Sequence, residues 1–328
     1  METMISLNEI AILPARKSYI KSRNDIDPYD INGKLPVFVA PMTCILNDKN
    51  IDIFEDSLAI PIAPVDFLSP EYGMLPEENS WKALTLKQFE HWFVDENAPN
   101  DKQYNILIDC ANGHMDTLYN YVRIAKENYR DQLCVMIGNI ANPETYIDCC
   151  NTGVDYVRVG IGGGFGCTTS VQTGIHASLP YLLNWINTYK KQRLLQNKFT
   201  TKIVADGGIG TTAKIIKCLA LGADYVMCGE MFAYCEEAGE LYKGKTYKQY
   251  YGQSSILGQQ DRFGKVVSAP EGTIVQIQSK YTLDQLMHNI ESVLRSAMSY
   301  CNCATLGSFI GNVKTCRQSV NEFVQYEK

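Results

Sequence analysis

The stretch "TKIVADGGIGTTAKIIKCLALGADYVMCGE" (201–230) decides the fold of this 328-residue chain. It opens with a continuous apolar run over 201–208, continues into a helical pattern over 211–222, and closes with a second apolar run over 225–230. Continuous apolar runs, unlike alternating ones, are typical of strands buried on both faces of a parallel sheet. The stretch therefore predicts a strand, a crossover helix and a second parallel strand.

The same unit recurs towards the N-terminus. Comparable apolar runs occupy 35–42, 58–65, 105–111, 132–139 and 156–161, and "SWKALTL" (80–86) is the candidate for an eighth strand. Helical stretches are expected at 115–130, 143–152, 177–196 and, near the C-terminus, 283–301. Strands that alternate with helices indicate an α/β fold, and eight of them close a (β/α)8 TIM barrel. An open doubly wound sheet is the alternative. The barrel is favoured because polar or glycine residues follow strand after strand, as at the catalytic face of a barrel.

Composition limits the class of protein. The formal net charge is −6 and no Lys/Arg stripe is present, so no nucleic-acid partner is expected. No apolar run is long enough to span a membrane, and no signal peptide is evident. Twelve scattered cysteines in a chain of this length indicate free thiols in a reducing compartment, hence a cytoplasmic protein. We expect one domain over 1–328 without an inserted regulatory module.

A long polar excursion follows the last predicted strand. Residues 231–275 are rich in glycine and tyrosine and show little apolar periodicity. Loops of this length without internal structure are usually lids or binding loops. We therefore expect a lid over about 240–275 at the catalytic face.

The glycine-rich stretch "VGIGGGFGCTT" (159–169) carries the first chemical signal. Glycine loses more backbone freedom on folding than any other residue, so such a run belongs where a ligand approaches the amides. Amide donors at the end of a strand favour an anion and the thiolate form of Cys167, which is the nucleophilic form. Two alternatives stay open: a dinucleotide-binding fingerprint and an inert buried thiol. The loop lies in mid-chain and lacks the apolar helix start of the fingerprint.

The second signal lies at the ends of the last two predicted strands, where barrels commonly bind phosphate. The amides of Gly207, Gly208 and Gly229 are candidate phosphate ligands. Asp206 is anionic and cannot bind phosphate, but it can accept hydrogen bonds from ribose hydroxyls. Together these residues predict a nucleotide beside Cys167.

Several motifs resemble the inosine monophosphate dehydrogenase / GMP reductase family along nearly the full length. They are "LPARKSYIKSRNDID" (13–27), "VFVAPM" (37–42), "IDCANGHMD" (108–116), "GVDYVRVGIGGGFGCTT" (153–169), "VADGGIGT" (204–211), "YYGQSS" (250–255), "PEGT" (270–273) and "LRSAMSYC" (294–301). The resemblance implies that Cys167 attacks purine C2 of the bound nucleotide and that hydride moves between C2 and a nicotinamide. It also implies a hydroxyl at Thr169 close to the reacting carbon and a proton donor and acceptor at Glu271.

The resemblance assigns further residues by position. The substrate-binding set is Met42, Asp206, Gly207, Gly208, Cys228, Gly229, Tyr251, Gly252 and Gln253, and the cofactor-binding set is Asn112, Gly113, His114, Ser254 and Ser255. His114 as a purely structural residue is an equal alternative. A monovalent cation such as K⁺ is implied on the backbone carbonyls of Gly162, Gly164 and Cys167, and a homotetramer is implied as the assembly.

The reaction direction is predicted from details of the motifs. "DCANGH" (109–114), "YKQYYGQSS" (247–255) and the short span to Glu271 resemble GMP reductase, which implies NADPH-dependent conversion of GMP to IMP and ammonia. Asp261-Arg262-Phe263 instead resembles the dehydrogenase, which oxidises IMP to XMP with NAD, with Arg262 as base. A non-catalytic purine-nucleotide-binding barrel is the third alternative. The chain departs from the family pattern at Phe165, which replaces a phosphate-binding serine, at Thr43, which replaces an aspartate, and at Gln253, which replaces a methionine.

Overall fold

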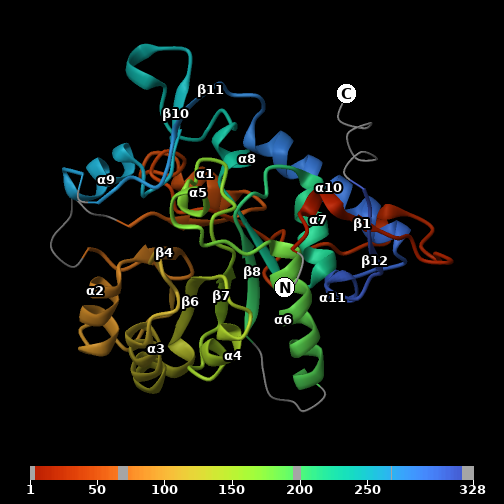
Figure 1. Cartoon of the computed structure of the whole chain (residues 1–328), viewed down its shortest axis with the longest axis horizontal. Helices are drawn as coiled ribbons and strands as arrows, with labels where there is room; N and C mark the ends of the chain where they lie inside the picture. Colours follow the sequence, from red (N-terminus) through yellow and green to blue (C-terminus); the bar gives the residue numbers. More distant parts are fainter. Residues whose placement is uncertain (1–3, 66–72, 195–200, 267, 320–328) are drawn as a thin grey trace.

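A computed structural model describes residues 4–65, 73–194, 201–266 and 268–319 and shows a closed barrel (Figure 1). Its eight parallel strands follow one another in chain order, and the last pairs with the first through Val37 and Val226. The strands are β2 (Val37–Val39), β3 (Ile60–Ala63), β4 (Trp81–Leu84), β5 (Tyr104–Ile108), β6 (Leu133–Ile140), β7 (Tyr156–Val159), β8 (Lys202–Asp206) and β9 (Tyr225–Cys228). The predicted TIM barrel is confirmed, and 80–86 does supply a barrel strand.

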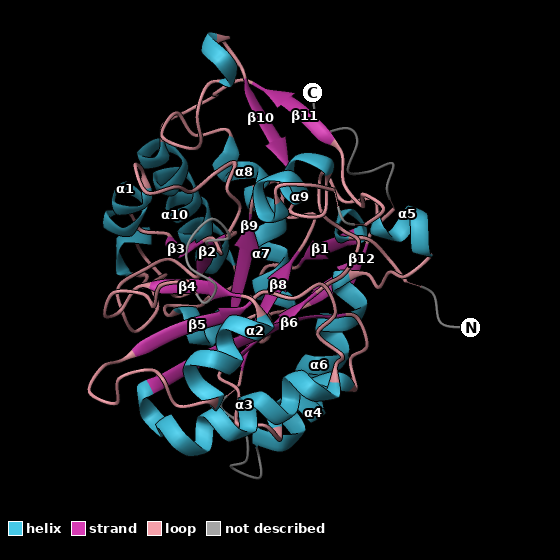
Figure 2. Ribbon diagram, turned by 90° about the vertical axis from the view of Figure 1, so that its left-hand side faces the viewer, coloured by secondary structure: helices cyan, strands magenta, loops and turns pink. Residues whose placement is uncertain are grey.

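Helices surround the barrel on its outer side (Figure 2). The α-helices of this layer are α1 (Ile51–Asp56), α2 (Leu86–Phe89), α3 (Asp116–Tyr129), α4 (Thr145–Cys150), α6 (Leu179–Leu194), α7 (Thr212–Leu221) and α10 (Leu283–Tyr300). The short helix α8 (Glu230–Ala233) instead lies beyond the carboxyl end of β9. A π-helical turn, η3 (Glu90–Val94), extends α2. Helix α7 shows how sequence sets these bounds, because the Thr211 side chain accepts from the Lys214 amide at its start and Gly222, with φ of 111°, ends it.

Strand side chains alternate between two apolar layers. The inner layer fills the barrel around Phe38, whose ring lies 5.4 Å from that of Trp81 and 5.2 Å from that of Tyr225. The outer layer lies between the strands and the helices. It includes Val37 and Val39, which flank Phe38 in β2. The barrel interior is therefore a packed core, and the loops beyond its strand ends are where a barrel of this kind binds ligands.

Smaller elements complete the chain. A two-stranded sheet joins β1 (Ile10–Ile12) to β12 (Thr315–Arg317), next to α11 (Leu306–Phe309). The remaining 3-10 turns are η1 (Leu7–Glu9), η2 (Arg23–Asp25), η4 (Arg130–Gln132) and η5 (Tyr242–Gly244).

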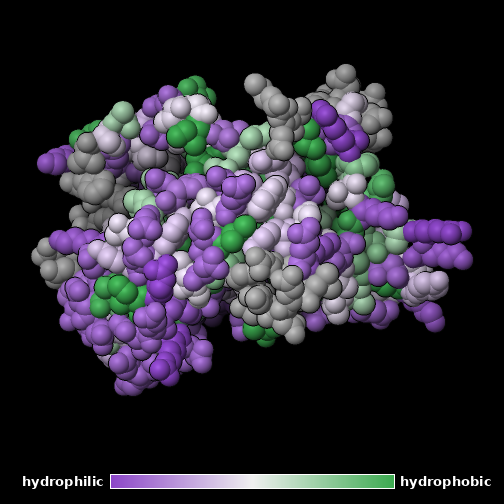
Figure 3. All heavy atoms as spheres, turned by 60° about the horizontal axis from the view of Figure 1, so that its bottom comes forward, coloured by the Kyte–Doolittle hydropathy of each residue, from purple (hydrophilic) through white to green (hydrophobic). Residues whose placement is uncertain are grey.

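All twelve cysteines lie in the described residues and are free. Polar residues predominate on the face in Figure 3, with only scattered hydrophobic ones. Within the described ranges, no helix is both long and apolar enough to cross a membrane.

The lid contains regular structure that the sequence did not predict. Strands β10 (Lys248–Tyr251) and β11 (Ile274–Ile277) form an antiparallel pair, and α9 (Ile256–Phe263) lies between them in the chain. Figure 2 shows this pair above the barrel. The expectation of an irregular loop was wrong because the two strands are distant in sequence, and a pairing of that kind leaves no local periodicity.

Candidate active site

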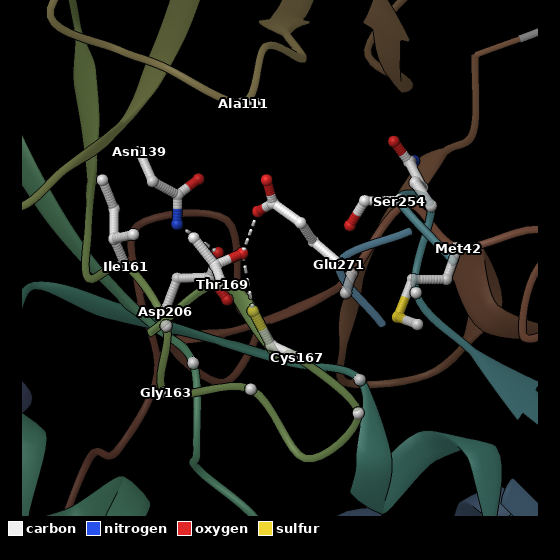
Figure 4. Close-up of a pocket in the computed structure, with 18 of the residues that line it drawn as sticks. Met42, Ala111, Asn139, Ile161, Gly163, Cys167, Thr169, Asp206, Ser254 and Glu271 are labelled. Carbon is white, nitrogen blue, oxygen red and sulfur yellow. Dashed lines mark hydrogen bonds between the residues drawn. The ribbon is translucent and has the colours of Figure 1, made fainter. Parts of the chain in front are cut away.

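A cavity of about 710 Å³ opens at the carboxyl ends of the barrel strands. Its wall combines loop residues from most strands with residues of the lid (Figure 4). Predicted site residues in the lining are Met42, Gly162, Gly164, Cys167, Thr169, Asp206, Gly207, Gly208, Gly229, Gly252, Gln253, Ser254 and Glu271. The volume lies within the usual range for small-molecule and cofactor sites.

Three of the lining side chains form a hydrogen-bonded chain. The Cys167 thiol donates to Thr169 Oγ1 at 3.3 Å, and the Thr169 hydroxyl donates to Glu271 Oε2 at 2.6 Å. Thr169 lies between the other two side chains in Figure 4. Thr169 begins the short helix α5 (Thr169–Thr173), which fixes it directly after the glycine loop. A thiol, a hydroxyl and a carboxylate are thus connected by hydrogen bonds along which a proton can move.

Glu271 belongs to the lid, and it lies beside Thr169 because the backbone of the lid pairs with the glycine loop. The Thr168 amide donates to Glu271 O at 3.0 Å, and the Thr273 amide donates to Gly166 O at 2.9 Å. On the lid's own side, the Glu271 amide donates to Ser254 O at 3.0 Å. These main-chain contacts place the backbone of Glu271 beside the glycine loop, and the hydrogen bond from Thr169 orients its carboxylate.

The glycine loop packs on the turn after β8. Gly207 and Gly208 have φ of 97° and 74°, and a Cβ on Gly208 would lie 2.6 Å from Gly163 O. A Cβ on Gly229 would lie 2.9 Å from Met42 Sδ. Within the described residues, the N–H groups of Gly207, Gly208 and Gly229 have no hydrogen-bond acceptor. We call these three residues the amide cradle, because their amides are available to a ligand beside Cys167.

A buried charge cluster lies deeper in the cavity. Arg158 of β7 contacts Asp206 at 2.9 Å and Asp109 at 3.2 Å. Asn139 also donates to Asp206 Oδ2, at 2.8 Å. Burial opposes the charge of Arg158, but the carboxylates of Asp206 and Asp109 outweigh it and raise the pKa of the guanidinium. Asp109 is one of the lining residues, and its Oδ2 is buried and has no hydrogen-bond partner among the described residues.

Three predicted substrate or cofactor residues lie outside the lining, two of them because side chains alternate along a strand. Cys228 is buried in the outer layer, and its neighbour Met227 lines the cavity instead. Tyr251 contacts Asp261, whereas its neighbour Tyr250 lines the cavity. Ser255 is buried as the N-cap of α9, and its side chain accepts from the Gly258 amide. In β9 and β10 the adjacent residue lines the cavity instead, because successive strand side chains point to opposite faces.

In the "ANGH" segment (111–114), Ala111 lines the cavity, whereas Asn112, Gly113 and His114 lie outside the lining. His114 Nε2 accepts from the Ala141 amide at 3.1 Å, and its Nδ1 is 3.1 Å from Thr145 Oγ1. Burial lowers the pKa of His114, so the neutral ring is favoured. Gly113 is required because a Cβ there would lie 2.8 Å from the backbone at Gly138 and Asn139. Asn112 accepts from the His114 amide at 3.0 Å.

Asn139 and Glu230 were expected at the catalytic face, as polar residues just past predicted strands, but no binding or catalytic role was assigned to them. Asp109, Arg158 and Tyr250 were not selected at all, and all five residues line the cavity. Arg158 was the signal in the sequence, because it is a charged residue within an apolar run. Such a residue is almost never buried unless it is paired, so Arg158 indicated buried acidic partners. The side chains of Arg262 and Phe263, which favoured the dehydrogenase, lie outside the described residues.

The predicted cation ligands lie in the glycine loop. Gly162 O accepts from Ser170 Oγ at 3.2 Å, and Gly164 O accepts from the Cys167 amide at 3.0 Å. A carbonyl oxygen has a second lone pair, so these bonds leave room for an ion. The residues are compatible with K⁺, and the cation site stays a prediction.

A (β/α)8 barrel with a cysteine, a threonine and a glutamate in hydrogen-bond contact at a cavity beyond its strand ends has the features of a barrel enzyme. Comparison with known families gives the particular group. Residues 100–325 match the model of the IMP dehydrogenase / GMP reductase domain, and the chain belongs to that family. The family consists of NAD(P)-dependent purine-nucleotide oxidoreductases, as the motifs predicted.

Individual relatives carry both names of the family. The chain is 30% identical to a GMP reductase of Lactobacillus acidophilus, over 92% of this chain and 91% of that protein, and 31% identical to one of Staphylococcus carnosus, over 92% of each. It is 36% identical to an inosine-5'-monophosphate dehydrogenase of Chlorobaculum parvum, over 65% of this chain. The match covers 44% of that dehydrogenase, which is less than half of its length.

Proposed function

We propose that this chain is a reductase of the GMP reductase type, which converts the guanine ring of a GMP-like substrate to hypoxanthine with release of ammonia. For GMP itself the products are IMP and ammonia, and NADPH is the reductant. The proposal rests on the hydrogen bonds that connect Cys167, Thr169 and Glu271, because they link a nucleophile to a carboxylate through a hydroxyl.

The first half of the reaction exchanges the 2-amino group for sulfur. The Cys167 proton passes through the Thr169 hydroxyl to Glu271, in the direction in which the two hydrogen bonds donate. The thiolate then forms a bond to purine C2. Protonated Glu271 returns the proton through Thr169 to the 2-amino group, so the C2–N bond breaks and ammonia leaves. An amide anion is too poor a leaving group to depart without this proton.

The second half restores the enzyme. NADPH, when bound, supplies the hydride that ends on C2. The C2–S bond breaks as the new C2–H bond forms, and Cys167 leaves as a thiolate. The thiolate takes up one proton from solvent through the Thr169–Glu271 chain. Over the whole cycle the guanine ring, NADPH and one proton give the hypoxanthine ring, NADP⁺ and ammonia.

The charge cluster offers a place for the reductant. The buried Asp109 Oδ2 is an acceptor without a partner among the described residues, so it fits a ribose hydroxyl or a carboxamide N–H of a nicotinamide nucleotide. Arg158 holds this carboxylate from its other oxygen at 3.2 Å. Ser254 and Gln253 line the same cavity from the lid.

Two observations favour the reductase over the dehydrogenase. The GMP reductase relatives match along nine tenths of both chains, whereas the matched dehydrogenase extends well beyond the aligned part. The Thr169–Glu271 contact also suits a reaction in which an amino group must be protonated. By resemblance, we also propose a homotetramer, which size-exclusion chromatography with light scattering tests.

The proposal is tested by absorbance of the reduced nicotinamide. We expect guanine-ring substrates to oxidise NADPH, and Cys167→Ala to lower turnover by about 10⁴-fold or more because the covalent route is lost. Cys316→Ala is the matched control, since this exposed thiol lies on β12 away from the cavity lining.

The outcomes separate the alternatives. Production of NADH with IMP, and no NADPH consumption with guanine compounds, assigns the chain to the dehydrogenase. Binding without turnover in either direction assigns it to the nucleotide-binding barrels. Unchanged turnover in Cys167→Ala contradicts the proposed mechanism.

A further inference from the structure

The amide cradle has an unusual neighbour, the carboxylate of Glu230. Glu230 is the first residue of α8, directly after Gly229, and it lines the cavity. Its Oε2 would lie 2.5 Å from a Cβ on Gly210, which precedes the start of α7. A negative charge of the chain itself therefore lies where barrels commonly receive a ligand phosphate.

This carboxylate is not neutralised by a direct partner. Within the described part of the chain, no side chain forms an ion pair or hydrogen bond with Glu230. Burial raises its pKa, and the more distant Lys214 and Lys280 oppose this. Glu230 thus keeps its capacity to accept hydrogen bonds from a ligand.

Phe165 changes the other wall of the cradle. It lies in the glycine loop, lines the cavity and keeps 45% of its surface exposed. Its ring centroid is 5.7 Å from that of Tyr250 on the lid. A phenyl group offers no hydrogen-bond donor to a phosphate oxygen, so this wall is apolar where a phosphate needs donors.

We infer that the substrate is a guanine ribonucleoside without a 5′-phosphate, and that Glu230 is the residue that selects it. This inference rests on the proposed reductase chemistry and narrows its substrate class. A phosphate in the cradle meets the like charge of Glu230, and like charges placed together in a binding site disfavour that ligand strongly.

A 5′-hydroxyl satisfies the same groups. It donates to the Glu230 carboxylate, which phosphate oxygens ionised near neutral pH do not, and its oxygen accepts from an amide of the cradle. Asp206 remains available to the ribose hydroxyls, as the sequence predicted. The base and Cys167 keep the same relation, because only the phosphate end of the site differs.

The experiment compares guanosine with GMP as substrates with NADPH, by kcat/KM in the wild type, Glu230→Gln and Glu230→Ser. We expect guanosine to be preferred by about tenfold or more, and both variants to reduce this preference by about tenfold, mainly through the KM for GMP. Glu240→Gln is the matched control, because this carboxylate is exposed and pairs with Lys49 at 2.6 Å.

Equilibrium binding of both compounds to the same proteins, by calorimetry, decides the inference separately from turnover. If neither compound oxidises NADPH, the proposed function fails. In that case the inference is still supported if the wild type binds guanosine more tightly than GMP and Glu230→Gln removes this difference in affinity. A preference of the wild type for GMP, or equal preferences in wild type and Glu230→Gln, overturns the inference while leaving the reductase chemistry intact.

Discussion

At the scale of single residues, surroundings divide twelve cysteines into different chemical groups. Burial raises the pKa of Cys149 and of Cys134 to about 12, and Cys218 is raised further, so these thiols stay protonated and inert. Cys167 instead lies at the cavity with its thiol on the Thr169 hydroxyl. The residue type is the same, and only the neighbours make one of them a candidate nucleophile.

The hydroxyl of Thr169 gives a prediction at this scale. We expect Thr169→Val to lower kcat by about 10²–10⁴-fold, because Glu271 loses its route to the thiol and the amino group. Rapid quench with detection of ammonia measures this step directly. Thr168→Val is the control, since the Thr168 hydroxyl contacts Gln172 and not the reacting chain. An equal loss in both variants would show a general disturbance of the loop.

At the scale of elements, polar contacts hold the lid together and join it to the loop after β2. Asp261 of α9 accepts from Tyr251 at 2.6 Å and from Thr43 at 3.2 Å. Gln253 donates to Pro41 O at 2.7 Å. An aspartate at position 43 would face the Asp261 carboxylate, so Thr43 and Asp261 form a compatible pair.

We therefore expect Asp261→Ala to lower kcat/KM by about 3- to 10-fold, a modest effect because these contacts are partly exposed to water. Steady-state kinetics and chemical denaturation measured on the same variant test this. The midpoint of barrel unfolding should stay unchanged in Asp261→Ala. Tyr251→Phe keeps the contact between Asp261 and Thr43, so it should lower kcat/KM less than Asp261→Ala does. A lower unfolding midpoint without a change in kcat/KM would show that Asp261 stabilises the barrel and does not position the lid.

At the scale of the whole molecule, stability depends on the packed interior of the barrel. Phe38 is buried and contacts aromatic rings from three other strands, those of Trp81, Tyr156 and Tyr225. This packing joins strands distant in the chain, so the closed barrel and its catalytic face depend on it together.

Phe38→Ala should lower the free energy of unfolding by about 3–5 kcal/mol, because the substitution removes buried apolar surface and leaves a cavity. Urea denaturation followed by circular dichroism measures the change. Ile31→Ala should have an effect within about 0.5 kcal/mol, since Ile31 is 98% exposed. Similar losses in the two variants would contradict this account of the core.

The sequence by itself determined the barrel strands, the helices around them and the glycine loop with Cys167. These features are local, because apolar runs, caps and glycines act within a few residues of each other. Only the tertiary structure decided that Glu271 meets Thr169, that Arg158 joins Asp109 to Asp206, and that the lid forms a strand pair. It also decided that Tyr250 and Met227 line the cavity where Tyr251 and Cys228 were expected. These outcomes depend on which face of a strand points inward and on contacts between distant segments, and both are fixed only when the barrel closes.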